Sequence, residues 1–397
     1  MADKLAIDGG APVREEFLPY SRPVLSDEDV AAAVGVLKSG WLTTGPDIPA
    51  FEREFAAFVG AEHAVAVSSC TAALHIAYLT VPLRAGDEVI VPALTFSATA
   101  AAAVAAGGRP VVADVREDLN IDPGDVERRL GPRTRAVAVV HLGGLPCDMT
   151  SLEAICREHD LALIQDCAHA VGATYEGQRL GGRGRAACYS FHAVKQIAAG
   201  EGGAVATNDA AVAAKGRLYR NHSLTTSAAE RHGPAAGYGY DIVGLGHNFR
   251  MADVNAALAR SQLERFAEDD ARRQAIAAAY DEAFASRDDV EVIPTPANVK
   301  HGRHLYVIKL RLEALREGRD AIFRALRAEN VGVNVHYIPL HYHSFYRDNF
   351  GYRRGDFPKA EALFERVITL PLFAAMTEGD VGDVLTAVDK VLSHYRK

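Results

Sequence analysis

Strand-like apolar runs alternate with helix-like segments over the first half of the chain, and this alternation constrains the fold most strongly. Five runs have the length and composition of strands, at residues 64–67, 88–91, 109–113, 136–140 and 161–164. Helix-like segments separate them, at residues 71–80, 96–105, 123–130 and 150–158. Such alternation predicts a mostly parallel, doubly wound α/β sheet. Two shorter apolar runs, at 187–190 and 203–207, are expected to complete it.

The second half of the chain predicts a smaller domain that a long helix joins to the first. Residues 251–284 are continuously helical in composition, being rich in Ala, Leu, Gln and Arg. Beyond them the pattern predicts strands at 306–310 and 331–335 and helices at 319–329, 358–366 and 378–395. Ser26 and Thr377 each precede an acidic residue by three positions, the pattern of a capping box that begins a helix. We therefore predict an N-terminal arm (1–25), a large domain (26–270) and a small C-terminal α/β domain (271–397).

Charge and cysteine content restrict the partners and the compartment of the protein. The formal net charge of −8 disfavours a nucleic-acid-binding surface. Five cysteines occur without a CxxC pair, at Cys70, Cys147, Cys156, Cys167 and Cys188. An odd and scattered set indicates reduced thiols, and no apolar stretch is long enough to span a bilayer. We expect a cytoplasmic protein with neither a nucleic-acid nor a membrane partner.

Three polar side chains at the ends of predicted strands have the chemistry that holds pyridoxal phosphate. Asp166 follows the strand at 161–164, whereas Ser190 and Lys195 lie in the segment CYSFHAVKQIAAGEGGAV. In such a site a carboxylate keeps the pyridinium nitrogen protonated, a hydroxyl binds the phosphate, and the lysine forms a Schiff base. Each residue alone is typical of a solvated surface or a helix cap, so the inference depends on all three together.

This lysine segment resembles the active-site segment of the DegT/DnrJ/EryC1/StrS sugar aminotransferase family. The resemblance extends from Tyr20 to the C-terminal helix, and it is closest to the nucleotide-sugar C4 aminotransferases of the pseudaminic acid pathway type. It implies the aspartate-aminotransferase-like α/β fold (fold type I), with a large and a small domain. It also implies pyridoxal 5′-phosphate as cofactor, pyridoxamine 5′-phosphate as its half-reaction form, and Lys195 and Asp166 as catalytic residues.

The resemblance assigns further residues to the cofactor. Cys70 and Thr71 begin a helix, where free backbone N–H groups favour a phosphate, although the family usually has Gly or Ala at the position of Cys70. Ser190 is implied as a second phosphate ligand. The family places an aromatic face against the pyridine ring at the position of Phe96 and a His or Gln beside the phenolic oxygen at His169. Asn248 is expected to reach the cofactor phosphate of a partner subunit, which implies a homodimer with shared active sites.

Three segments are implied to contact a nucleotide-linked sugar. Their residues are Tyr20, Gly40, Trp41, Leu42, Thr43, Val335, His336, Tyr337 and Ile338. His341 and His343 follow the last segment, but no carboxylate or thiolate nearby completes a usual ligand set. We therefore expect no metal site.

The expected function is a transaminase that moves an amino group, from L-glutamate, to C4 of a nucleotide-linked 4-keto-6-deoxyhexose. An enzyme for a 3-ketosugar or a keto-cyclitol is an alternative, because the cofactor motifs are common to these enzymes. A pyridoxamine-phosphate-dependent sugar dehydratase is disfavoured, since such relatives have histidine in place of the lysine. A non-catalytic regulator is disfavoured because Lys195 and Asp166 are both present.

Overall fold

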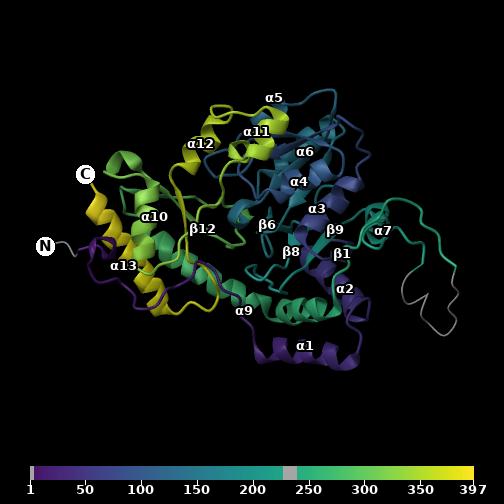
Figure 1. Cartoon of the computed structure of the whole chain (residues 1–397), viewed down its shortest axis with the longest axis horizontal. Coiled ribbons are helices and arrows are strands. Elements are labelled where there is room, and N and C mark those ends of the chain that lie inside the picture. Colours follow the sequence, from purple (N-terminus) through teal and green to yellow (C-terminus); the bar gives the residue numbers. More distant parts are fainter. Residues whose placement is uncertain (1–3, 227–238) are drawn as a thin grey trace.

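The computed structural model describes residues 4–226 and 239–397, and a seven-stranded sheet lies at its centre (Figure 1). In spatial order the strands are β1 (His63–Val67), β9 (Gly203–Thr207), β8 (Ala186–Ser190), β5 (Ala162–Asp166), β4 (Thr134–Val140), β2 (Glu88–Pro92) and β3 (Arg109–Ala113). The neighbours from β8 to β3 pair in parallel, whereas β9 pairs antiparallel with both β8 and β1. The predicted α/β sheet is confirmed, and the predicted strand ends lie within two residues of the observed ones.

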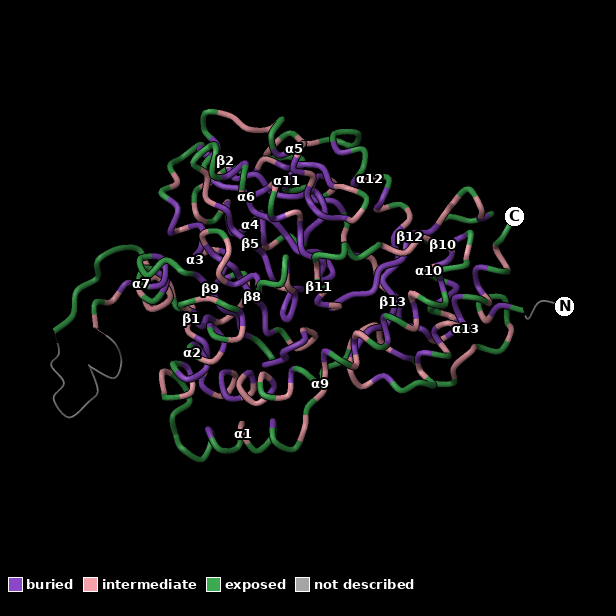
Figure 2. Tube along the Cα trace, turned by 180° about the vertical axis from the view of Figure 1, so that it is seen from behind, coloured by how far each residue is buried: buried purple, intermediate pink, exposed green. Residues whose placement is uncertain are grey.

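Helices pack on both faces of this sheet. They are α2 (Asp47–Val59), α3 (Cys70–Leu79), α4 (Ala98–Ala105), α5 (Pro123–Arg128), α6 (Met149–Glu158) and α7 (Ala210–Tyr219). Alternate residues of β1 enter different cores: Ala64 packs with α2 and α6, and Val65 packs with α3 and α4. Figure 2 shows the buried residues concentrated in the strands between these helices. The pattern had not indicated α2 and α7.

The long helix α9 (Asp253–Phe284) connects the central sheet with the C-terminal part of the chain (Figure 1). Phe266 packs in the core on one face of the central sheet, whereas Ile276 and Tyr280 pack in a separate C-terminal core. That second core contains β10 (Val290–Val292), β12 (Tyr306–Leu310), β13 (Val367–Leu370), α10 (Arg319–Ala328) and α13 (Glu378–Tyr395). Two shorter helices are α11 (Ser344–Phe350) and α12 (Pro358–Phe364), and a small sheet contains β11 (Val299–Lys300), β6 (Thr174–Tyr175) and β7 (Gln178–Arg179). The domain boundary near residue 270 falls within α9 and stays a prediction.

One predicted strand, at residues 331–335, is wrong. This segment makes only isolated bridges, from Val331 to Leu18 and from Asn334 to Thr369. Gly332 explains the difference, because a Cβ at this position would lie 2.6 Å from the carbonyl oxygen of Leu18. The N-terminal arm therefore lies beside this segment, which adds only the bridge from Asn334 to Thr369 at the edge of the three-stranded sheet β10-β12-β13.

The N-terminal arm is irregular, as predicted, apart from a short 3-10 turn at Ala6–Asp8. Glu329, a fully buried carboxylate, fixes it by accepting hydrogen bonds from the backbone N–H groups of Ala6 and Val13, each at 2.9 Å. Lys390 lies 2.8 Å from the same carboxylate. The Glu329 carboxylate thus ties the arm to the C-terminal core through two backbone hydrogen bonds, and Lys390 balances its buried charge.

Two features bear on the expected environment of the protein. All five cysteines are free. No helix within residues 4–226 and 239–397 is long and apolar enough to cross a membrane.

Helix α1 (Asp27–Ser39) begins at the predicted capping box and is attached to α9 by one buried carboxylate. Asp29 accepts hydrogen bonds from the Ser261 hydroxyl and the Arg265 guanidinium, each at 2.7 Å, and from the backbone N–H of Ser26 at 3.0 Å. Burial raises the pKa of Asp29, but these donors outweigh it and hold the pKa below its ordinary value. The capping box at Thr377 is present as well.

We predict that Asp29→Asn loosens α1 from α9, with a loss of about 2–3 kcal/mol of unfolding free energy, because Arg265 loses a buried anionic partner. Trp41, the only tryptophan, follows α1 closely, so its fluorescence during urea unfolding measures the effect. Asp27→Asn, on the exposed first turn, is the control and should change stability by less than about 0.5 kcal/mol. The Asp29 contribution is present above its unfolded pKa and should disappear in the wild type below about pH 4. Equal unfolding midpoints for the two variants would contradict this anchor.

Candidate active site

A cavity of about 400 Å³ lies where the carboxyl ends of β1, β5 and β8 meet the beginning of β9. The register explains the meeting point: Gly203 at the start of β9 pairs with Val67 at the end of β1 and with Ser190 at the end of β8. Asp166 ends β5 and pairs with Cys188 of β8. Ligands bind at this edge in open α/β sheets.

Ten of the residues that the sequence analysis assigned to the site line this cavity. They are Tyr20, Cys70, Thr71, Phe96, Asp166, His169, Ser190, Lys195, His336 and Tyr337. Seven others do not line it: Gly40, Trp41, Leu42, Thr43, Asn248, Val335 and Ile338. The structure therefore brings together both catalytic candidates and every cofactor candidate except Asn248.

The first turn of α3 forms one wall of the cavity. Ser69 caps this helix, and its hydroxyl accepts a hydrogen bond from the backbone N–H of Ala72 at 3.1 Å. A Cβ at Gly203 would lie 2.6 Å from the backbone nitrogen of Cys70, so only glycine lets β9 approach this turn. The N–H groups of Cys70 and Thr71 have no acceptor within a helix that begins here, and such a turn favours an anion.

Asp166 is a buried carboxylate, and several donors surround it. Oδ1 accepts a hydrogen bond from the backbone N–H of Ala168 at 3.0 Å and lies 3.9 Å from the Cys70 thiol. Oδ2 accepts a hydrogen bond from the Thr99 hydroxyl at 2.7 Å. Burial raises the pKa of Asp166, while these donors and the charge of Lys195 oppose the rise. The ionised form of Asp166 is thus stabilised when a cationic group lies near it.

Lys195 lies on the loop that joins β8 to β9. Burial lowers the pKa of its amine to about 8, even though the charge of Asp166 opposes this shift. The next residue fixes the loop, because the Gln196 side-chain amide donates to the carbonyl oxygens of His169 at 3.3 Å and Gly302 at 2.9 Å. Roughly a tenth of an amine with this pKa is neutral, and therefore nucleophilic, at pH 7, far more than for an ordinary lysine.

His169 is held in one tautomer by its two neighbours. Burial holds the pKa of this ring well below its usual value, so the ring is neutral. Its Nδ1 accepts from the backbone N–H of Gly143 at 3.3 Å, which leaves the proton on Nε2 to be donated to the Tyr337 hydroxyl at 3.1 Å. The ring of His304 lies against it, with centroids 4.5 Å apart.

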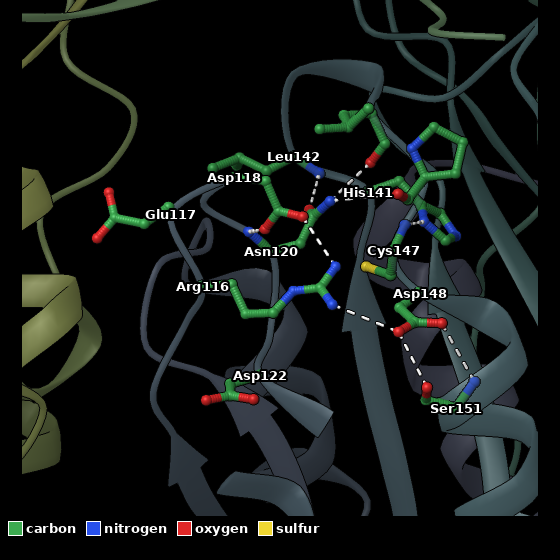
Figure 3. A network of polar contacts seen from close by, with 12 residues as sticks. Arg116, Glu117, Asp118, Asn120, Asp122, His141, Leu142, Cys147, Asp148 and Ser151 are labelled. Atoms are coloured by element: carbon green, nitrogen blue, oxygen red, sulfur yellow. Dashed lines mark hydrogen bonds and ion pairs between the residues drawn. The ribbon is translucent and has the colours of Figure 1, made fainter. Parts of the chain in front are cut away.

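The Gly143 donor is positioned by a polar network between the loops that follow β3 and β4 (Figure 3). Asn120 is central to it: its side-chain oxygen accepts from the backbone N–H of Leu142 at 3.1 Å, and its amide donates to the carbonyl of Leu145 at 3.1 Å. These two bonds clamp the turn Leu142–Gly144, from which Gly143 contacts His169.

Phe96 exposes its ring although it is a large apolar side chain. It is 59% exposed, lines the cavity, and has its ring centroid 6.0 Å from that of Tyr337. An uncovered aromatic face beside a buried carboxylate suits a planar aromatic cation.

These features fit pyridoxal phosphate. The α3 turn and Ser190 would hold its phosphate, Phe96 would cover its ring, Asp166 would bind its ring nitrogen, and Lys195 would bind its aldehyde carbon. These residues thus provide partners for the phosphate, the ring face, the ring nitrogen and the aldehyde of the group.

Asn248 and the loop Gly40–Thr43 lie away from this cavity, whereas Val335 and Ile338 flank the cavity-lining His336 and Tyr337. Asn248 is exposed and makes an isolated backbone bridge to Asn221. Trp41 and the adjoining loop lie close by, since Thr43 bridges Ala252 and Trp41 lines a hollow with Asn221. Their assignment to cofactor and substrate stays a prediction.

Thr99 and His304 are among the residues of the site that the sequence analysis missed. Thr99 donates a hydrogen bond to Asp166. The sequence gives a weak sign of this role, because Thr99 follows Thr95 at the spacing of one helical turn, with Phe96 between them. His304 lies in the C-terminal half of the chain, and no local pattern marks it as a partner of His169.

The histidines after β12 do not form a metal centre with one another. His341 is buried, and its Nε2 lies 2.9 Å from the carboxylate of Glu361. Across the described ranges, no group of three or more His, Cys, Asp or Glu side chains is arranged to hold a metal ion.

Similarity to known proteins covers nearly the whole chain. The profile of the DegT/DnrJ/EryC1/StrS aminotransferase family matches residues 23–389. The spore coat polysaccharide biosynthesis protein SpsC of Bacillus subtilis is 41% identical over 381 residues, which are 96% of this chain and 98% of SpsC. An uncharacterised protein of Methanocaldococcus jannaschii is 37% identical over 97% of this chain and its own full length.

Solved structures show the same fold. Helicobacter pylori PseC, an aminotransferase involved in pseudaminic acid biosynthesis, superposes with a TM-score of 0.90 at 30% identity, over 96% of this chain and 100% of PseC. The sugar aminotransferase Spr1654 of Streptococcus pneumoniae, in its pyridoxamine phosphate form, gives 0.89 at 30% identity, over 95% of this chain and 99% of its own. The cofactor of this class is pyridoxal phosphate, which alternates with pyridoxamine phosphate. The chain belongs to the DegT/DnrJ/EryC1/StrS aminotransferase family and is a pyridoxal-phosphate-dependent sugar aminotransferase.

Proposed function

We propose that the protein transfers an amino group from L-glutamate to C4 of a nucleotide-linked 4-keto-6-deoxyhexose. The observation that carries the proposal is the convergence of the Lys195 amine and the Asp166 carboxylate in one cavity. The likeness to PseC over 96% of this chain supports the choice of sugar, because PseC acts in pseudaminic acid biosynthesis. The likeness to a polysaccharide biosynthesis protein over nearly its full length supports the same class of substrate.

Lys195 is proposed as the group that binds the cofactor and moves the proton. When bound, pyridoxal phosphate acts as an electron sink that makes the Cα–H of an amino acid acidic. With a pKa near 8, the Lys195 amine is basic enough to take that proton and acidic enough to return it. Burial, which lowers its pKa, is therefore part of the proposed mechanism.

The remaining side chains are proposed to orient the reactants. Asp166 would hold the proton on the ring nitrogen, and the first turn of α3 would hold the phosphate at the opposite end. His169, fixed by Gly143, donates to Tyr337 and so keeps that hydroxyl at the cavity wall. A sugar with a keto group would enter beside Tyr20 and His336, whose rings lie 5.8 Å apart.

The active unit is proposed to be a homodimer in which Asn248 reaches the partner's cavity. Asn248 is exposed and does not line the cavity of its own subunit. The preceding segment exposes four large apolar side chains, with Leu245 81% exposed, at Tyr240, Ile242, Val243 and Leu245. Such a surface favours a protein interface.

The loop Gly40–Thr43 is proposed to cross the same interface. The backbone N–H of Asp253 donates to the carbonyl of Leu42 at 3.0 Å, so this loop is fixed beside the segment that carries Asn248. Trp41 and Leu42 are 54% and 52% exposed. If Asn248 enters the partner's site, this loop contacts the partner's substrate.

Covalent loading of the apoprotein should accelerate as pH rises through about 8, because only the neutral Lys195 amine attacks the cofactor aldehyde. The visible absorption band gives the rate, and borohydride followed by peptide mapping identifies the modified residue. Lys215→Ala, on the exposed face of α7, should load as wild type does, and Lys195→Ala should bind the cofactor without a covalent bond. A midpoint near the ordinary lysine value of about 10.4, or a label on another lysine, would refute the assignment.

The substrate proposal is tested with L-glutamate and a panel of 4-keto and 3-keto nucleotide sugars. We expect an aminated 4-keto-6-deoxy sugar and an equal amount of 2-oxoglutarate, both measured by mass spectrometry. Lys195→Ala should give neither product. Amination of 3-keto sugars alone would contradict the C4 assignment while leaving the aminotransferase class intact.

The shared site predicts complementation between two inactive variants. In a heterodimer of Lys195→Ala and Asn248→Asp chains, one site receives an intact lysine from one chain and an intact asparagine from the other. Random pairing with independent sites restores roughly a quarter of wild-type activity. Activity is measured after mixing and reassembly, and native mass spectrometry verifies the heterodimer. Heterodimers without activity would place Asn248 in its own subunit's site or away from any site.

A further inference from the structure

Two buried hydroxyl groups form a chain that ends on Asp166. The Thr99 hydroxyl lies 2.7 Å from Asp166 Oδ2, and the Thr95 hydroxyl lies 2.8 Å from that of Thr99. Thr99 is fully buried, and Thr95 and Asp166 are 2% and 5% exposed. Water therefore cannot replace these contacts freely.

The protonation state of Asp166 fixes the direction of this chain. An ionised carboxylate only accepts hydrogen bonds, so the single Thr99 proton must point at Oδ2. The Thr99 oxygen is then an acceptor for the Thr95 hydroxyl, whose single proton also lies within reach of the Phe96 carbonyl at 3.1 Å. Hydrogen bonds aligned in this way polarise one another and favour the negative charge at their end.

The two oxygens of Asp166 are not equivalent. Oδ1 faces two donors, the Ala168 N–H at 3.0 Å and the Cys70 thiol at 3.9 Å. Among the described residues Oδ2 accepts only from the Thr99 hydroxyl, so one of its lone pairs can accept from a further donor. The oxygen that Thr99 holds is thus the one free to bind a ring N–H.

The backbone of Thr99 is itself fixed. The hydroxyl of Tyr78, a fully buried residue of α3, donates to the Thr99 carbonyl at 2.9 Å. Helix α3 also begins with Cys70 at the anion-binding turn. Phe96, between the two threonines, exposes its ring at the cavity. The segment from Thr95 to Thr99 therefore contacts three parts of the site. It carries Phe96, it donates a hydrogen bond to Asp166, and it is held by α3, whose first turn is the proposed phosphate site.

We propose that Thr99 is a positioning residue that keeps Asp166 ionised and aims Oδ2 at the cofactor's ring nitrogen, with Thr95 orienting the Thr99 hydroxyl. The inference rests on the proposed role of Asp166. Thr99 itself touches neither substrate nor cofactor and acts only through the carboxylate.

The test compares Thr99→Val, which keeps the shape and removes the hydroxyl, with Thr99→Ser, which keeps the hydroxyl. Each holoenzyme carries pyridoxal phosphate labelled with 15N in the ring. In Thr99→Val the 15N resonance should move toward the unprotonated value, and kcat should fall about 10-fold to 100-fold with little change in the KM for the amino donor. Thr99→Ser should restore both. Thr95→Val should move the resonance in the same direction by a smaller amount.

Thr80→Val is the matched control, since Thr80 is 2% exposed and its hydroxyl donates to the Ala77 carbonyl at 2.7 Å, away from the cavity lining. It should leave the resonance unchanged. An unmoved resonance in Thr99→Val, or a Thr99→Ser enzyme as impaired as Thr99→Val, overturns the proposal. If Thr99→Val does not fold, an unmoved resonance in Thr95→Val overturns it.

Asp166→Asn separates this inference from the proposed function. If it moves the resonance while Thr99→Val does not, only the role of Thr99 fails. If Asp166→Asn leaves the resonance unchanged, the assignment of Asp166 fails, and the role of Thr99 with it.

Discussion

A buried negative charge needs compensation, and the architecture of this site follows from that requirement at Asp166. An isolated carboxylate in a protein interior is unfavourable unless donors or cations surround it. Here the backbone N–H of Ala168, the hydroxyl of Thr99 and the charge of Lys195 supply partial compensation. A pyridinium cation bound at the proposed cofactor site would supply the remaining compensation.

The same interior environment acts in the opposite direction on Lys195. Burial disfavours its ammonium form and brings the pKa to about 8. The same cavity therefore favours the neutral form of the Lys195 amine, and it accommodates the ionised form of Asp166 when a cation lies nearby. Both effects have one cause, the exclusion of water by the packed ends of β1, β5, β8 and β9.

Glycine residues let the backbones of the elements around the cavity approach one another closely. Gly203 lets β9 approach the first turn of α3, and Gly144 lets its loop pass within contact of the carbonyl of His169. Gly302 accepts from the amide of Gln196 and thereby links the C-terminal half of the chain to the lysine loop. The cavity depends on these long-range contacts more than on any single helix or strand.

The sequence by itself determined the strand positions of the central sheet, the capped helices and the pairing of Lys195 with Asp166, because apolar periodicity, capping patterns and strand ends are local properties. It did not determine the reversal of β9, the irregular path at 331–335 or the role of Thr99. Those depend on which distant segments share space: β9 lies between β1 and β8, and Leu18 lies against Gly332. The resemblance to the family already implied that Asn248 serves another chain, but only the tertiary structure decided that the loop Gly40–Thr43 lies outside this chain's cavity, since the backbone N–H of Asp253 at the start of α9 holds the carbonyl of Leu42.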